Sequence, residues 1–500
     1  MIHSDQPIPD AARSYMEAMP PGDWFLFDMS PLDRTGVPAY KAALFPDDCD
    51  TAACEMQQGT GYGETPERAI IAAVAECYEE VHARLGFARM RQVGGSYRQL
   101  VAERGRGGVV DPLELCLPAG FAVDRDSPLS WVEARRWFSR EPVLVPVDVA
   151  ALSADHLPGG YEPFTTLITN GLGAGPTPGW AAAHGLFECL QRDGNGLFFR
   201  AMDPGVRLTF ADPLPPELQA GIDRVMNAGI DLLPKFGTDE FGLVNLYVVG
   251  PDRDHDASPV PIAMTGGGEA SDLDRHAALR KAVLEYAHAR ARKAFTFGPL
   301  ELVREVMPPG YWERVEPRTE RAARLAEPRQ VEAFRRWLQL DGGSLRDLLA
   351  DPVFTVRSER PFETLATSDI TAPEEKGNEA ARRLRAAGFD PLVLDWTEPG
   401  APMHAARVVV PGLEVETMSY YRIGERGVAK LVQQDSPLIR WGEPDEHRRP
   451  VRLSPEAYDR LGGVPLFDTA EADRRVGGLY PLYREPGSHE MLFHMEREPA

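Results

Sequence analysis

The pattern of apolar and polar residues predicts three long amphipathic helices, each preceded by a run of glycines. Apolar residues recur at helical spacing from Ala69 to Val81, after the start signal Thr65-Pro66. A second helix is expected after Thr177-Pro178, and a third from Leu273 to about Ala294, capped by Ser271-Asp272. The three segments therefore share one order of features.

The glycine runs predict turns that could meet an anion. They are Gly59–Gly63, Gly171–Gly175 and Gly266–Gly268. A glycine-rich turn leaves backbone N–H groups open, and the start of a helix adds a favourable dipole. Each helix also carries glutamate well past its start, and these residues are Glu76, Glu79, Glu188 and Glu285. Glu76 and Glu79 lie three positions apart, so they share a face.

The remaining chain predicts an α/β (α+β) protein with mixed sheets flanked by helices. Strands are expected at Ser130–Trp137, Pro142–Val149, Gly242–Val249, Pro259–Met264, Leu392–Asp395 and Ala406–Val410. An amphipathic helix is expected within Val206–Leu233, and a polar connector at Thr371–Asn378. We expect an N-terminal extension over 1–29, a catalytic domain over 30–415 with a helical insertion at about 300–370, and a C-terminal extension over 416–500 with little periodicity.

The amino-acid composition argues against several classes of function. The chain of 500 residues has 54 Lys and Arg against 76 Asp and Glu, a net charge of -22. This balance argues against general binding to nucleic acid or to an anionic membrane, since both require a cationic surface. No apolar run reaches the ~20 residues that span a bilayer, and the N-terminus does not resemble a signal peptide. The five cysteines show no metal spacing, and a cytoplasmic protein is expected.

The candidate chemistry is a nucleotide triphosphate held with Mg²⁺. Magnesium prefers hard oxygen ligands and shares them with phosphate, and the four glutamates could supply such ligands. Arg192 and Arg290 are candidates for phosphate contacts. The sequence has no Walker A motif, no dinucleotide fingerprint, no GxSxG and no Cys–His nucleophile pair. Glutamates on one such helix are usually solvated, but three copies in the same order favour a site.

Five ordered blocks resemble the YcaO family. They are SPLDRTGVPAYKA, GYGETPERAIIAAVAECYEE, TNGLGAGPTPGWAAAHGLFECLQRDG, GGGEASDLDRHAALRKAVLEYAHARAR and AAGFDPLVLDWTEPGAPMHAARVVVPGLE, and together they cover roughly 30–415. The resemblance implies a YcaO-type fold and an enzyme that uses ATP and Mg²⁺ to phosphorylate a peptide backbone amide. It implies that Glu76, Glu188 and Glu285 are catalytic. Those three and Glu79 would bind metal, and Glu79, Asn170, Gln191, Arg192, His288 and Arg290 would surround the nucleotide.

Three positions depart from the family's pattern. Gln191 stands where the second block usually has a glutamate, His288 where the third often has glutamine, and Ala72 where the first has serine. Gln191 can ligate through its carbonyl oxygen but brings no charge. A nucleotide-binding scaffold without turnover is therefore an alternative, and a kinase or ligase acting on a small molecule is another.

The resemblance also implies a substrate and partners. We expect a ribosomally made peptide and favour azoline formation, with thioamide or amidine formation by the same activation as alternatives. Many cyclodehydratases work with a ThiF-like leader-peptide-binding partner, and thioamidation implies an accessory protein; a homodimer also remains open. The chain ends MLFHMEREPA, without the proline-rich tail of many cyclodehydratases, which raises the case for thioamide or amidine chemistry.

Overall fold

The structure is a computed structural model. It describes residues 1–47, 56–152, 154–165, 167–201, 203–258, 260–325, 328–415, 421–483, 489 and 491. None of the helices in these ranges is both long and apolar enough to cross a bilayer. Most of the C-terminal stretch MLFHMEREPA lies outside the described residues.

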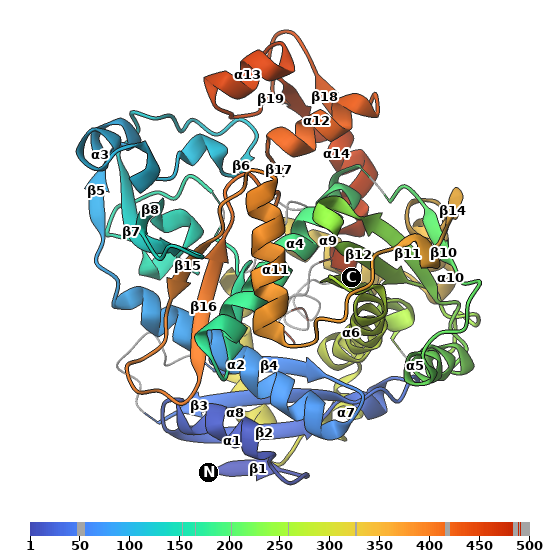
Figure 1. Ribbon diagram of the computed structural model, residues 1–500. Helices are drawn as coiled ribbons and strands as arrows, with labels where there is room; N and C mark the ends of the chain where they lie inside the picture. Colours follow the sequence, from blue (N-terminus) through green and yellow to red (C-terminus); the bar gives the residue numbers. More distant parts are fainter. Residues whose placement is uncertain are drawn as a thin grey trace.

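Three sheets form the body of the protein, and they surround its centre (Figure 1). The first has the order β1 (Ile2–Ser4), β2 (Gly22–Asp28), β3 (Ala39–Pro46) and β4 (Gln57–Tyr62). The second has the order β13 (Gly268–Asp272), β12 (Val244–Val249), β11 (Leu233–Thr238), β10 (Val206–Thr209) and β14 (Ser358–Pro361). The third runs β5 (Val93–Gly95), β7 (Leu129–Arg136), β15 (Leu392–Asp395), β16 (His404–Val409) and β9 (Leu172–Gly175), with β8 (Pro142–Pro146) paired to β7.

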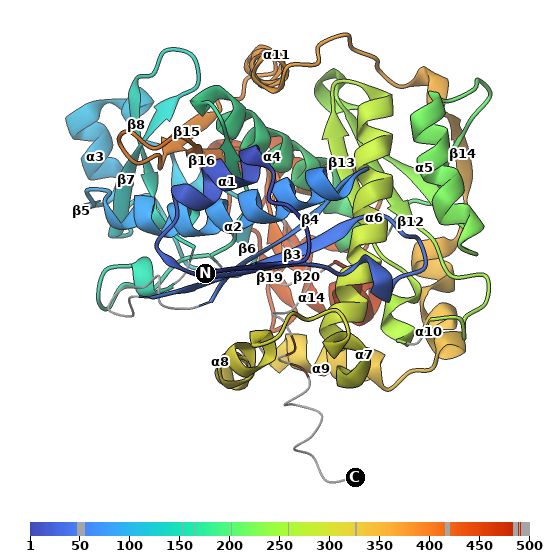
Figure 2. The ribbon, with the colours of Figure 1, turned by 90° about the horizontal axis from the view of Figure 1, so that it is seen from below.

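Three long helices directly follow the terminal strands of these sheets. Helix α2 (Pro66–Ala88) follows β4, α4 (Pro178–Ala201) follows β9, and α6 (Arg275–Phe297) follows β13. Figure 2 shows them crossing the middle of the molecule between the sheets. The expected helices are confirmed, but the cap of α6 is Asp274, which accepts a hydrogen bond from the Ala277 N–H. Ser271 and Asp272 belong instead to β13.

Most of the first two glycine runs, and Gly268 of the third, lie in strands rather than in anion-binding turns. A Cβ atom at Gly61 would overlap the backbone nitrogen of Ala73, and one at Gly173 or Gly268 would overlap a carbonyl oxygen of the following helix. The missing side chains therefore let each terminal strand lie directly against its own helix. The prediction of phosphate-cradling turns is wrong for the first two runs, whose glycines serve strand–helix packing. In the third run, Gly266 and Gly267 precede β13, and Gly267 lines the central cavity.

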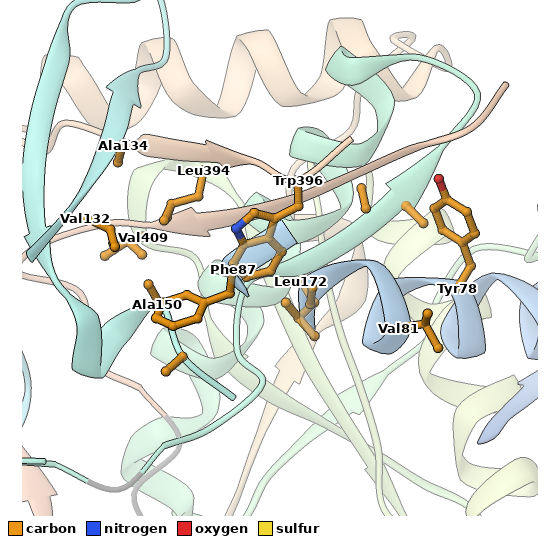
Figure 3. Packing of buried hydrophobic residues seen from close by; sticks show 14 of the residues in the cluster. Tyr78, Val81, Phe87, Val132, Ala134, Ala150, Leu172, Leu394, Trp396 and Val409 are labelled. Carbon is orange, nitrogen blue, oxygen red and sulfur yellow. The ribbon is translucent and has the colours of Figure 1, made fainter. Parts of the chain in front are cut away.

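A shared apolar core fixes α2 against the third sheet. Phe87 of α2 lies near Leu172 of β9, Leu394 of β15 and Trp396, and Tyr78 lies further along α2 in the same core (Figure 3). The Tyr78 hydroxyl donates a hydrogen bond to the backbone oxygen of Met403, 2.8 Å away. This packing holds α2, and the glutamates on it, in register with β9.

The other helices are shorter than α2, α4 and α6. They are α1 (Asp10–Glu17), α3 (Tyr97–Arg104), α5 (Pro216–Asn227), α7 (Leu300–Arg304), α8 (Tyr311–Leu325), α9 (Pro328–Leu338), α10 (Gly342–Leu349), α11 (Pro373–Ala386), α12 (Glu425–Gln433), α13 (Pro455–Leu461), α14 (Thr469–Val476) and α15 (Tyr480–Tyr483). The expected connector Thr371–Asn378 is wrong, because α11 already begins at Pro373. Pro261–Met264 is a 3₁₀ helix rather than a strand.

The two ends of the chain are folded onto the body. Strand β2 pairs with β3 along its whole length, so the predicted boundary at residue 29 falls within one sheet. Residues 421–483 carry β17 (Arg422–Ile423), which pairs with β6 (Leu117–Pro118). They also carry the small sheet β18 (Ile439–Arg440), β20 (Leu466–Asp468) and β19 (Arg448–Pro450). The orange and red segments at the top of Figure 1 show this region. The chain returns inward at Leu482, which lines the central cavity.

Candidate functional site

A cavity of about 590 Å³ lies where the three terminal strands and their helices meet. Six carboxylate side chains line it: Glu76, Glu79, Glu80, Glu188, Glu269 and Glu285. Asn170, Arg192 and Arg292 line it as well. The site is thus built from all three sheets, and it concentrates negative charge within a protein-walled space.

Backbone groups of the terminal strands hold the glutamates. The Thr60 N–H of β4 donates to Glu76 Oε2 at 2.6 Å. The N–H groups of Gly171 and Ala174 donate to Glu188 Oε2 at 2.8 Å and to Glu79 Oε1 at 2.9 Å. A terminal strand leaves N–H groups without a strand partner, and here carboxylates accept from them. The same hydrogen bonds orient the carboxylates, because each uses one oxygen of its group.

The same arrangement recurs between β13 and α6. Glu285 of α6 accepts a hydrogen bond from the backbone of Glu269, on β13. The Tyr62 hydroxyl of β4 also donates to Glu285 Oε2, at 3.0 Å. Charged acceptors make these bonds stronger than neutral ones. The carboxylates of α2, α4 and α6 are therefore positioned by the strands before any ligand binds.

The cavity disfavours so much negative charge without a counter-ion. Burial, followed by the charges of Glu188 and Glu76, raises the pKa of Glu79 well above its usual value. Burial also raises the pKa values of Glu76 and Glu285, and that of Glu269 to about 7. The Glu76 side chain keeps surface open to the cavity, but a carboxylate confined there is solvated less well than one in bulk water. Bound cations would relieve this cost.

Basic side chains compensate only part of the charge. Arg192 lies 3.7 Å from Glu188 Oε1 and 3.5 Å from Glu269 Oε2. Lys41 of β3 is buried and donates to Gln58 Oε1 at 2.5 Å. Burial and the nearby Arg292 guanidinium lower the pKa of Lys41 to about 7. The site therefore holds more carboxylates than basic groups in contact with them.

These side chains fit Mg²⁺ held jointly with phosphate. Carboxylate oxygens are its preferred protein ligands, and it usually takes only one or two of them together with water and phosphate oxygens. Within the described ranges, no three Asp, Glu, His or Cys side chains enclose a metal position by themselves. Glu76, Glu79, Glu188 and Glu285 would hold the metal, and Arg192 would contact phosphate.

Six of the nine predicted site residues line the cavity together. They are Glu76, Glu79, Asn170, Glu188, Arg192 and Glu285. Gln191 is buried behind the wall, where its amide contacts Lys281 and Glu269. The His288 ring lies against Tyr62, with ring centroids 5.0 Å apart. Burial and the Arg292 charge lower the pKa of His288 to about 3, so it is neutral and packs beside Tyr62.

Arg290 lies outside the cavity. Its side chain is 1% exposed and forms ion pairs with Asp33 at 2.9 Å and Asp252 at 3.0 Å. Position 290 follows Glu285 by five residues, about 140° around the helix, whereas Arg292 follows by seven and returns to about 20° from it. The expected nucleotide contact by Arg290 is therefore not supported. Arg292 occupies the place in the cavity that Arg290 was expected to take.

We predict that Arg290→Met destabilises the protein by about 3–5 kcal/mol, because it leaves the carboxylates of Asp33 and Asp252 buried beside an apolar side chain. Arg292→Met, on the cavity side of the same helix, serves as the matched control and should cost much less. Denaturant unfolding of the three proteins measures both effects. Equal stability of wild type and Arg290→Met would contradict the structural role of Arg290.

Sequence reasoning missed several residues of the site. Arg292 had a signal, since the spacing of seven from Glu285 places both on one helix face. Lys41 lies within a block that resembles the family, but nothing in that block indicates burial. Glu269 lies on β13, a strand that was not predicted because the preceding glycine run was interpreted as a turn. Glu80 follows Glu79 directly, and its place in the wall depends on how α2 packs.

Solved structures share the fold. A heterocyclase in complex with substrate and cofactor superposes with a TM-score of 0.58 at 16% identity, and the match covers 83% of this chain but only 53% of the heterocyclase. YcaO from Methanopyrus kandleri, bound with AMPPCP and Mg²⁺, superposes with a TM-score of 0.54 at 18% identity, covering 83% of this chain and 91% of the other. The heterocyclase TruD gives a TM-score of 0.52 at 14% identity, covering 80% and 59%.

Sequence relatives extend over most of the chain. An uncharacterized protein of Methanothermobacter thermautotrophicus is 26% identical over 80% of this chain and 91% of its own length. A protein of Rhizobium leguminosarum bv. trifolii, encoded in the tfuA 3′ region, is 26% identical over 74% of this chain and 80% of its own. The sequence model of the YcaO cyclodehydratases, which are ATP- and Mg²⁺-binding, matches residues 60–414. The chain therefore belongs to the YcaO family of ATP- and Mg²⁺-binding proteins.

Proposed function

We propose that this protein activates a backbone amide of a ribosomally made peptide by phosphorylating the amide oxygen at the expense of ATP. The observation that carries the proposal is the convergence of carboxylates from α2, α4 and α6 on one cavity. Strand β4 holds Glu76, whereas β9 and the glycine just before it hold Glu79 and Glu188. Such preorganised charge suits the binding of a metal–nucleotide complex.

The chemistry explains why ATP is needed. An amide oxygen leaves poorly, so transfer of a phosphoryl group to it converts the loss of water into the loss of phosphate. A nucleophile adds to the carbonyl carbon, and the phosphate departs with the former amide oxygen. When bound, ATP supplies the phosphoryl group and Mg²⁺ neutralises the charge that develops on it.

The side chains of the cavity would bind and orient. Glu76, Glu79, Glu188 and Glu285 would hold the metal, since hydrogen bonds from the strands and Tyr62 already fix their carboxylates. Arg192, which touches Glu188 and Glu269, would face the phosphates. Positive charge placed where negative charge develops is usually the largest catalytic contribution in such sites.

We favour an azoline product, in which a Cys, Ser or Thr side chain of the peptide is the nucleophile. Two structural neighbours are heterocyclases, which supports this product. Thioamide formation from sulfide is the second candidate, because one relative is encoded beside tfuA and a neighbouring gene product could act as an accessory protein. A separate leader-peptide-binding partner is part of the proposal in the azoline case.

Mass spectrometry of peptides encoded beside the gene tests the proposal. The protein is incubated with ATP, Mg²⁺ and each candidate peptide, with and without sulfide and the neighbouring gene products. Loss of one water with release of ADP indicates an azoline, and exchange of oxygen for sulfur indicates a thioamide. ADP release without any peptide, together with a phosphorylated small molecule, would contradict the proposal and favour a kinase or ligase. Nucleotide binding without ADP release under every condition would favour a scaffold.

A further inference from the structure

Gln191 brings an amide, rather than a charge, to a position just behind the wall of the cavity. Its side chain is 3% exposed and bridges two elements. Lys281 Nζ of α6 donates to Gln191 Oε1 at 2.8 Å, and Gln191 Nε2 donates to Glu269 Oε2 at 3.4 Å. This orientation is dictated chemically, because ammonium only donates and an ionised carboxylate only accepts. The Gln191 oxygen is thus engaged by Lys281 and is turned away from the role of a metal ligand.

Glu269 supplies the carboxylate that α4 lacks at this point. It stands on β13, the terminal strand of the second sheet, and lines the cavity beside Glu188, Arg192 and Glu285. Its side chain is 8% exposed. Arg192 Nη1 lies 3.5 Å from Glu269 Oε2, and Nη2 of the same guanidinium lies 3.7 Å from Glu188 Oε1. One arginine therefore brings the two carboxylates to the same side of the cavity.

Burying a carboxylate is costly unless it is paired or coordinates a cation. Arg192 is shared with Glu188, and the side chains of Gln191, at 3.4 Å, and Asn195 add only neutral hydrogen bonds. Residue 269 directly follows the run Gly266–Gly268, of which Gly268 lies against α6. A glutamate at that position needs a further positive partner, and the cavity it faces is the proposed metal–nucleotide site.

We propose that Glu269 is a ligand of the divalent cation in this site, and that Gln191 positions it. The inference rests on the proposed function, because it assigns a role within the same metal–nucleotide site. The Glu269 carboxylate supplies the negative charge that a glutamate at position 191 would otherwise supply. We therefore expect that a glutamate at position 191 can replace the one at position 269 as a metal ligand.

A charge exchange tests the assignment. Mn²⁺ binding to the full chain is titrated by electron paramagnetic resonance in the presence of a non-hydrolysable ATP analogue, for wild type, Glu269→Gln, and the double variant Gln191→Glu with Glu269→Gln. Glu269→Gln should weaken Mn²⁺ binding about tenfold or more. The double variant should recover most of that loss. Glu67→Gln, an exposed carboxylate at the start of α2, controls for the loss of one negative charge.

The outcomes separate this inference from the proposed function. If wild type binds Mn²⁺ with the analogue and Glu269→Gln binds equally well, the assignment of Glu269 is wrong while the proposed function stands. Weakened binding in Glu269→Gln that the double variant does not recover, with unchanged melting temperatures, would overturn the exchange of roles. If wild type does not bind the metal with the analogue, both the proposed function and this inference fail.

Discussion

Glu188→Ala is expected to abolish detectable ATP turnover, a fall of at least about 100-fold, while the protein stays folded. Glu188 accepts a hydrogen bond from the Gly171 N–H and faces the cavity, so its removal deletes one fixed charge from the site. Glu76→Ala should have the same effect, because Glu76 holds the equivalent place on α2. ADP release in the presence of peptide and Mg²⁺ measures the loss, and circular dichroism reports the fold.

The control for this pair lies on the same helix as Glu76. Glu67→Ala removes an exposed carboxylate from the first turn of α2, and its turnover should match wild type. A nucleotide analogue titrated with Mg²⁺ should bind the two cavity variants more weakly than it binds the control. Wild-type turnover in both Glu76→Ala and Glu188→Ala would show that these carboxylates do not form the site.

Alanine at the glycines of the terminal strands is expected to destabilise the protein and damage the site together. A Cβ atom at Gly173 would overlap the carbonyl oxygen of Ala181, and one at Gly61 the backbone nitrogen of Ala73. The strand must move away from its helix, at a cost of about 1–3 kcal/mol. That movement also separates the strand N–H groups from Glu188 and Glu76. Thermal unfolding and Mg²⁺-dependent nucleotide binding measure the two effects.

Gly94→Ala is the matched control for the glycine variants. Gly94 lies in a strand, but a Cβ atom there would meet no other atom within 4 Å. The control should keep wild-type stability and nucleotide binding. If Gly61→Ala and Gly173→Ala behave like Gly94→Ala, the close approach of strand and helix does not govern the geometry of the site.

The helices could be predicted because their signals are local. The apolar period of α2 and the Thr65-Pro66 start are contained in a short stretch, and α2 forms where they indicate. The glutamates of α2, α4 and α6 followed from those helices, and their convergence followed from the repetition of the pattern. Together with the family resemblance, which added Asn170, the amino-acid pattern was enough to predict six of the residues that line the cavity.

The role of the glycines could not be predicted, because it depends on pairing between distant segments. Gly171–Gly175 resembles a turn in sequence, but its pairing with β16, more than two hundred residues later, makes it a strand. Arg290 shows a different limit. Its charge suggested a phosphate contact, whereas Asp33 and Asp252, both remote in sequence, bind it in the interior.

The C-terminal region escaped prediction for a related reason. Its strands are two or three residues long, too short for an alternating pattern to be recognised. They are stabilised by pairing with one another, and β17 pairs with β6, some three hundred residues earlier. Such elements exist through long-range contacts and carry little local signal.

The fate of the amide oxygen tests the central claim most directly. A substrate peptide found by mass spectrometry is prepared with a heavy oxygen isotope in the backbone carbonyl that the protein modifies. If the protein phosphorylates that oxygen, the isotope must appear in the inorganic phosphate released with ADP, whichever nucleophile attacks. Mass analysis of the phosphate should show one labelled oxygen for each modified amide. Unlabelled phosphate, with the isotope found in water or retained in the peptide, would contradict the account.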